Sequence, residues 1–313
     1  MDPNEVLKFL RLTYTGFSDG ALLALIALGL VLVFKSTDVI NFAHGEFMLL
    51  GGFVGYQLLT ITASWGIDPT LGTILSVAAL VAAMVIVGTL VERLILRPLI
   101  GEQIISVIMV TIGLSSIIDA IVGLAWGTIP QPLPYSIVPA ALSGRWQIEM
   151  EGARRPLNLP QEAMLTILVV VILVVLLMVF FKRSKYGIAM RATADDQQAA
   201  MSMGISIRVV FGLTWSLTAV LAGIAGLLIG ELTNAVGGDI PVVGLRAFPV
   251  IILGGLDSVA GAIVGGFTIA MLETYASGYL DPSLKNVVPY IALLIILMIK
   301  PYGLFGQKRI ERV

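Results

Sequence analysis

Long apolar stretches without charged residues recur along the chain and alternate with shorter polar segments. Residues 71–91, 163–181 and 209–230 contain no charged side chain, and each stretch is long enough to cross a bilayer as a helix. Further stretches extend the pattern: 20–34, 47–64, 104–118, 247–277 and 287–299. A helix satisfies its own backbone hydrogen bonds in lipid. The pattern therefore predicts an all-α polytopic membrane protein of about eight hydrophobic segments, with broken or re-entrant helices among them.

The placement of basic residues predicts an orientation. Lysine and arginine gather in 92–102, in 182–208 and after Lys300, whereas arginines in the Pro-rich connection 127–161 are offset by glutamates. The positive-inside rule places the three basic regions in the cytoplasm. Alternation then puts the amino terminus outside. The carboxyl terminus is cytoplasmic only if 247–277 enters and returns on the outer face, as a re-entrant hairpin does.

The composition excludes several classes of function. Hydrophobic residues make up 58% of the chain and charged residues 12%, against about a quarter charged in soluble domains. A net charge of −1 gives no case for nucleic-acid binding. Cysteine is absent and His44 is the single histidine, so thiol chemistry and a histidine metal cage are excluded within one copy. The first 15 residues lack the features of a cleaved signal, so we expect the first hydrophobic segment to be retained.

Two regions hold polar and flexible residues where a plain membrane anchor would be apolar. The first is 37–46 and the second is 253–261, which interrupts an apolar segment. Interrupted helices expose backbone ends that bind charged or zwitterionic solutes in transporters, so both regions are candidate parts of a solute path. The alternatives are a cytoplasmic turn with a capped helix start for the first region, and a helix N-cap near Asp257 for the second.

Glycine pairs and isolated ionisable residues also fall within the apolar stretches. Small residues one turn apart allow close helix packing, either within one subunit or between two subunits. Isolated ionisable residues in spans are expected to face the interior and to find partners. The glycine pairs are Gly16/Gly20, Gly51/Gly55, Gly123/Gly127, Gly226/Gly230 and Gly261/Gly265, and the ionisable residues are Asp19, Asp119, Glu231 and Glu273.

Three stretches resemble motifs of one transporter family. Ile40-Asn41-Phe42-Ala43-His44-Gly45-Glu46-Phe47, followed by Gly51-Gly52, resembles the motif of the branched-chain amino acid ABC transporter permeases. Residues 186–205 are similar to that family's cytoplasmic coupling loop, and 254–266 to its second broken-helix motif. The likeness covers about 16–303 and favours the first of the family's two permease types. Arg145, Arg154 and Arg155 have no counterpart in the pattern.

The resemblance implies one permease domain, 1–313, with a coupling loop at 182–206, in a bacterial inner membrane. Such a permease works with a second related permease, two ATPase subunits and a periplasmic solute-binding protein. The sequence has no phosphate-binding loop, so ATP and Mg²⁺ are expected on the ATPase chains and no enzyme activity, cofactor or metal in this one. The solutes of the family include leucine, isoleucine and valine, and also other neutral amino acids, urea, amides and aromatic compounds.

Two other classes stay open beside the ABC permease. An ion-coupled secondary transporter or channel would also use broken helices and buried carboxylates. An intramembrane enzyme would need a paired nucleophile and base, for which the sequence offers little.

The family's division of labour also implies a path without a tight permanent solute site and with a mostly apolar lining. We expect the two polar regions to approach one another around this path. The candidate path residues are Asn41, Phe42, His44, Glu46, Met48, Gly254, Gly255, Asp257 and Ser258.

Residues 189–205 are expected to contain a short cytoplasmic helix seated in a groove of one ATPase subunit. Thr193 is placed to cap it, with acidic residues in the first turn, and Gly204 to end it. The alternative is a surface helix that packs only on its own subunit. The candidate coupling residues are Arg191, Asp195, Asp196, Ala199, Ala200, Met203 and Gly204, of which Ala199, Ala200 and Met203 are expected to form a small apolar face.

Overall fold

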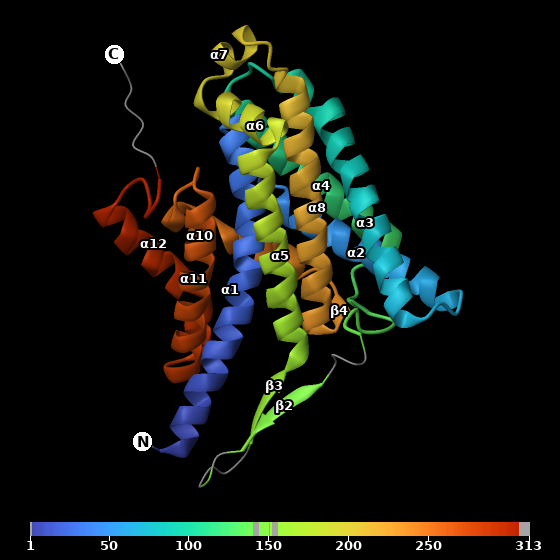
Figure 1. The fold of residues 1–313 in the computed structure, drawn as a ribbon, viewed down its shortest axis with the longest axis vertical. Helices are drawn as coiled ribbons and strands as arrows, with labels where there is room; N and C mark the ends of the chain where they lie inside the picture. Colours follow the sequence, from blue (N-terminus) through green and yellow to red (C-terminus); the bar gives the residue numbers. More distant parts are fainter. Residues whose placement is uncertain (1, 140–143, 150, 152–155, 307–313) are drawn as a thin grey trace. The chain divides into compact units, whose positions relative to one another are not determined.

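The computed structural model describes residues 2–139, 144–149, 151 and 156–306, and nearly all of its regular structure is helical (Figure 1). The long helices are α1 (Pro3–Thr37), α2 (His44–Ser64), α3 (Pro69–Val91), α4 (Ile104–Trp126), α5 (Gln161–Arg183), α8 (Ile207–Thr233) and α11 (Val259–Tyr279). The short helices are α6 (Lys185–Asp195), α7 (Gln197–Ser202), α9 (Ile240–Leu245), α10 (Ala247–Gly254) and α12 (Val288–Ile299).

Within the described ranges, seven helices are long and apolar enough to cross a membrane. They are the seven long helices above, with α3 extended by a π-helical turn, Glu92–Leu96, and a 3-10 turn, Arg97–Leu99. The prediction of an all-α polytopic membrane protein is confirmed. The apolar stretch 247–277 is divided into α10 and α11, as its interruption predicts.

Among the described residues, four short strands form two antiparallel pairs. β1 (Gln131–Pro132) pairs with β4 (Ala235–Val236), and β2 (Arg145–Ile148) pairs with β3 (Leu157–Pro160), with Arg145 opposite Pro160. Arg154 and Arg155 lie outside the described residues, as do the basic residues beyond position 306.

The chain divides into two compact units, and each is described by itself. Unit 1 comprises Met1–Ala27, Val138–Ile172 and Arg246–Val313, and unit 2 comprises Leu28–Ile137 and Leu173–Leu245. In unit 2, α8 packs along α2 and α3, while in unit 1, α10 packs against α11 and α12 (Figure 1).

Glycines set the closest helix contacts in both units. In unit 2, a Cβ added at Gly51 or Gly226 of the predicted pairs would collide with backbone of the facing helix. In unit 1, a Cβ at Gly20 would lie 2.8 Å from the ring of Phe267. Packing within one subunit therefore accounts for these pairs, whereas Gly123 has open space beside it.

Most isolated ionisable residues of the spans have partners inside their own unit. The Glu273 carboxylate accepts hydrogen bonds from Arg246, with Nε at 3.2 Å. Glu231 accepts the N–H of Ile137 at 3.0 Å and the hydroxyl of Ser136. Asp19 lies 3.6 Å from the Lys285 ammonium. The expected pairing is confirmed for these three carboxylates, whereas Asp119 is exposed.

Candidate transport and coupling sites

The first motif follows a sharp turn at the end of α1. Asp38 adopts a left-handed φ of 56°, and Asn41, which is fully buried, accepts the N–H of Ala43 on its Oδ1 at 3.0 Å. The N–H of Phe42 donates to Thr111 Oγ1 of α4 at 3.3 Å. Ala43 begins α2 without a side-chain cap. Long-range contacts and the local turn fix this helix start, and the alternative of a side-chain-capped start is not formed.

His44, the first residue of α2, is buried against glycine. A Cβ added at Gly29 of α1 would lie 2.6 Å from His44 Cε1, and the Gly29 carbonyl accepts a hydrogen bond from Thr218 of α8 at 3.2 Å. The next residue, Gly45, is packed against Pro241 of α9, where an added Cβ would lie 2.9 Å from Cα. The motif glycines and histidine therefore fill the junction of four helices in unit 2.

The remaining residues of the first motif differ in burial. Phe42 and Glu46 are half-buried, while Met48 is fully buried with its carbonyl against Gly226 and its sulfur beside Gly244. Met48 thus belongs to helix packing in this structure. The assignment of these side chains to a solute path stays a prediction.

The second motif forms the break between α10 and α11 in unit 1. Gly255 adopts a φ of 110°, which favours glycine. Ser258 caps α11 by accepting the N–H of Gly261 at 3.0 Å, so the N-cap is Ser258, and Asp257 beside it is half-buried. Gly254 and Gly261 touch through backbone, where neither position has room for a side chain.

The carboxyl-terminal end of α10 is not open. The carbonyl of Leu253 accepts the N–H of Leu304 at 2.8 Å, and that of Gly254 accepts the N–H of Phe305 at 2.9 Å. These carbonyls are therefore satisfied within the chain, contrary to the free helix end expected at this break. The two motifs lie in different units, and their approach around one path stays a prediction.

The coupling segment contains two helices in place of one. α6 is capped by Ser184, which accepts the N–H of Gly187 at 2.8 Å. α7 is capped by Asp196, which accepts the N–H groups of Gln198 and Ala199 at 2.8 and 2.9 Å. Thr193 is buried inside α6, so the prediction of a Thr193 cap is wrong. Asp195 ends α6 and Asp196 starts α7.

The predicted apolar face of the coupling segment is only partly right. Ala200 is buried within unit 2, Ala199 is exposed, and Met203, just beyond α7, is 83% exposed. Met201 is also exposed, so the available apolar surface is formed by Met201 and Met203. Gly204 follows with a φ of 83° and ends the segment as expected. Arg191 binds back to the carbonyl of Phe181 at the end of α5.

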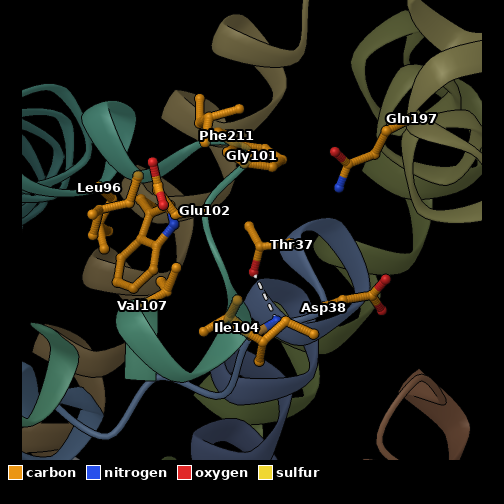
Figure 2. A pocket seen from close by; sticks show the side chains of 13 residues that line it. Thr37, Asp38, Leu96, Gly101, Glu102, Ile104, Val107, Gln197 and Phe211 are labelled. Carbon is orange, nitrogen blue, oxygen red and sulfur yellow. Dashed lines mark hydrogen bonds between the residues drawn. The ribbon is translucent and has the colours of Figure 1, made fainter. Parts of the chain in front are cut away.

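A cavity of about 260 Å³ in unit 2 lies next to the segment before the first motif and next to α7 (Figure 2). Asp38 and its neighbours before the first motif form one side, and Gln197 of α7 contributes to another. Glu102, from the connection to α4, and Trp215 of α8 also line the cavity. Trp215 and Glu102 are not among the predicted site residues, because Trp215 lies in a charge-free span, Glu102 lies in a basic segment, and neither position carries a motif signal.

A comparison with protein families decides the classification. The family model described as "Branched-chain amino acid transport system / permease component" matches residues 12–297. The chain belongs to this family. Its three motifs thus lie within a match that runs from the first third of α1 into α12, and the recognition made from the motifs is confirmed.

Relatives of known name cover the whole length of this family member. The high-affinity branched-chain amino acid transport system permease protein LivH of Escherichia coli K12 is 30% identical over 99% of both chains. BraD of Pseudomonas aeruginosa, a permease protein of the same description, is 28% identical over 99% of both chains. The probable LivH of Methanocaldococcus jannaschii is 29% identical over 93% of this chain and 91% of its own. Membership in a transport permease family agrees with the multi-pass helical architecture.

Proposed function

We propose that this chain is the permease subunit of an ATP-driven importer of branched-chain amino acids or related neutral solutes. The family match over nearly all of the chain is the observation on which the proposal rests, and the names of the relatives supply the substrate class. ATP and Mg²⁺ are assigned to two separate ATPase subunits, because the sequence has no phosphate-binding loop. A second permease and a periplasmic binding protein complete the proposed complex.

The path is proposed to run beside the first motif. Asn41 is fully buried, and its Nδ2 has no hydrogen-bond partner among the described residues. Polar groups buried in membrane proteins are costly and mark solute or ion pathways. A donor held at this junction can bind a carboxylate or carbonyl oxygen of a passing solute. Recognition of the solute is assigned to the binding protein, so the affinity here is expected to be weak.

The segment α6–α7 is proposed to receive the ATPase. It connects α5 to α8 directly, and its exposed methionines offer an apolar surface at a segment rich in basic residues. The contact of Arg191 with the Phe181 carbonyl, the packing of Met190 against α8 and the burial of Ala200 hold the two helices to the unit. A push on α7 would therefore reach α8 and the cavity beside the first motif as a rigid-body displacement.

Reconstituted uptake tests the class of transporter. The purified chain is placed in proteoliposomes alone, and again with the second permease, the ATPases and the binding protein. Leucine uptake that needs ATP and all partners is expected. Uptake by this chain alone, driven by a proton or sodium gradient, would identify a secondary transporter and overturn the proposal.

The proposed orientation has the amino terminus outside and α7 inside. The sequence has no cysteine, so single variants such as Met203→Cys and Ile129→Cys can be labelled in intact cells without a background. Both side chains are exposed. A membrane-impermeant maleimide is expected to label the variant at position 129 in intact cells and the variant at 203 only after permeabilisation. The reverse pattern contradicts the orientation.

A further inference from the structure

A groove between α3 and α8 in unit 2 combines an apolar wall with a basic end. The cavity measures about 580 Å³ and lies between the end of α3 and the first half of α8. Val85, Leu213 and Leu217 line its apolar part, and Arg97, Ser206 and Arg208 line its polar part. The two helices pack side by side. This groove belongs to neither of the sites described above.

The helix geometry separates the two parts of the groove along the membrane normal. Ser206 and Leu217 are eleven residues apart on α8, a rise of roughly 16 Å. On α3 and its extension, Arg97 follows Val85 by twelve residues, and this helix runs antiparallel to α8. Arg97 and Arg208 therefore lie at the same end of the groove. Val209 is 48% exposed beside them, and the groove opens onto the apolar outer surface of the spans.

The charges at this end are net positive. Glu92, which is fully buried in the π-helical turn, accepts hydrogen bonds from Arg97 Nε at 3.0 Å and Nη2 at 2.7 Å. That bidentate pair neutralises Glu92 and leaves Arg97 Nη1 available to another acceptor. Arg208 adds a positive charge that forms no salt bridge within the described part of the chain. An anion at this end is therefore favoured.

We propose that this groove binds an anionic diacyl phospholipid, with its phosphate at Arg208 and Arg97 and its acyl chains along Val85, Leu213 and Leu217. Basic pockets between membrane helices near the interface bind anionic headgroups in this way, and the apolar wall matches acyl chains that a free anion lacks. Ser206, at the start of α8, makes no side-chain cap, so its hydroxyl is available for a phosphate oxygen.

The headgroup would lie next to the coupling segment. A second cavity, of about 780 Å³, shares Arg97, Ser206 and Arg208 with the groove and reaches Gln198 and Met201 of α7. A lipid bound at the arginines therefore borders the surface proposed for the ATPase. The binding itself does not depend on the proposed function, because it concerns only this chain and its membrane.

Native mass spectrometry of the full chain in detergent tests the proposal with phosphatidylglycerol and phosphatidylcholine as probes. The wild type is expected to retain phosphatidylglycerol preferentially. Arg208→Gln should weaken that binding about fivefold, the effect of one basic residue at an anionic lipid surface. The matched control is Arg183→Gln, which removes an exposed charge at the end of α5, outside the groove, and should change nothing.

Two further measurements distinguish a lipid from other occupants. Val85→Trp keeps both arginines and fills the apolar part of the groove, so loss of phosphatidylglycerol in this variant supports acyl-chain binding, and unchanged retention contradicts it. Equal retention of the two lipids, or equal losses in Arg208→Gln and Arg183→Gln, overturns the proposal. Complete displacement of phosphatidylglycerol by inorganic phosphate would show an anion site without lipid specificity and would also overturn it.

Discussion

The contact between α3 and α8 predicts that two glycine-to-alanine substitutions, Gly88→Ala and Gly113→Ala, differ in their effect on thermal stability. A Cβ added at Gly88 of α3 would lie 2.6 Å from the Trp215 carbonyl oxygen and 2.7 Å from Ser216 Cα. Both atoms are backbone and cannot rotate away. Gly113 of α4 has no atom within 4 Å of the same added carbon. The two alanine variants therefore gain the same methyl group in opposite surroundings.

The structure sets the size of the effect. Ordinary contact begins at 3.4 Å, so Gly88→Ala requires the helices to separate by about 0.8 Å. A gap of that size removes roughly a quarter to a half of the dispersion attraction of the atoms that lose contact. Overpacking typically costs about 1–3 kcal/mol. Alanine gains up to about 1 kcal/mol of helix propensity over glycine, but this gain is common to both variants and cancels in their difference.

Thermal unfolding of the purified chain in detergent, followed by circular dichroism, measures that difference. Gly88→Ala should unfold about 2–6 °C below Gly113→Ala, at roughly 2 °C per kcal/mol. Equal midpoints, or a higher midpoint for Gly88→Ala, would show that the close contact at Gly88 does not limit the packing of α3 on α8.

Three other predictions concern transport and the buried charges. Gly29→Ala should displace the buried His44 ring and lower ATP-dependent uptake at least severalfold while the complex still assembles. Unchanged uptake would show that the contact between Gly29 and His44 is not needed for transport. Met201→Arg with Met203→Arg should leave the fold intact and abolish ATPase docking or coupling, and normal uptake with normal ATPase stoichiometry would refute the docking surface. Arg246→Gln should destabilise unit 1 by about 3–5 kcal/mol in a denaturant titration, because Glu273 would remain buried without its cation. The double variant Arg246→Leu with Glu273→Leu should recover most of this lost stability, because it leaves no buried charge unpaired.

Hydropathy was sufficient to predict the helices but not their contacts. The apolar stretches locate the long helices, because crossing lipid requires length and apolar composition that a sequence displays directly. The exception in extent is α1, which begins at Pro3, well before the predicted stretch 20–34. The interruption at 254–258 was equally visible, since glycine and a polar pair break an apolar run. The pairing of Arg246 with Glu273 could not be predicted from the sequence, because it depends on how α10 and α11 pack in three dimensions.

The coupling segment shows a similar limit at short range. Thr193 and Asp196 are both residues that cap helices, and local preference permits either. Tertiary packing decides between them, because Thr193 is buried and its hydroxyl donates to the Ala189 carbonyl at 2.9 Å inside α6. The same packing buries Ala200, so an arginine there would disrupt the unit, and docking is tested at the exposed Met201 and Met203.

The closure of the α10 end by Leu304 and Phe305 has a consequence for biosynthesis. Those two N–H groups leave the ribosome after the seven long helices of the described residues. Until then, the carbonyls of Leu253 and Gly254 must be hydrated or bound by another protein, because unsatisfied carbonyls are unfavourable in lipid. Unit 1 can therefore complete these hydrogen bonds only after residue 305 has been made, and a ribosome stalled before residue 304 would hold a unit whose α10 end is still open.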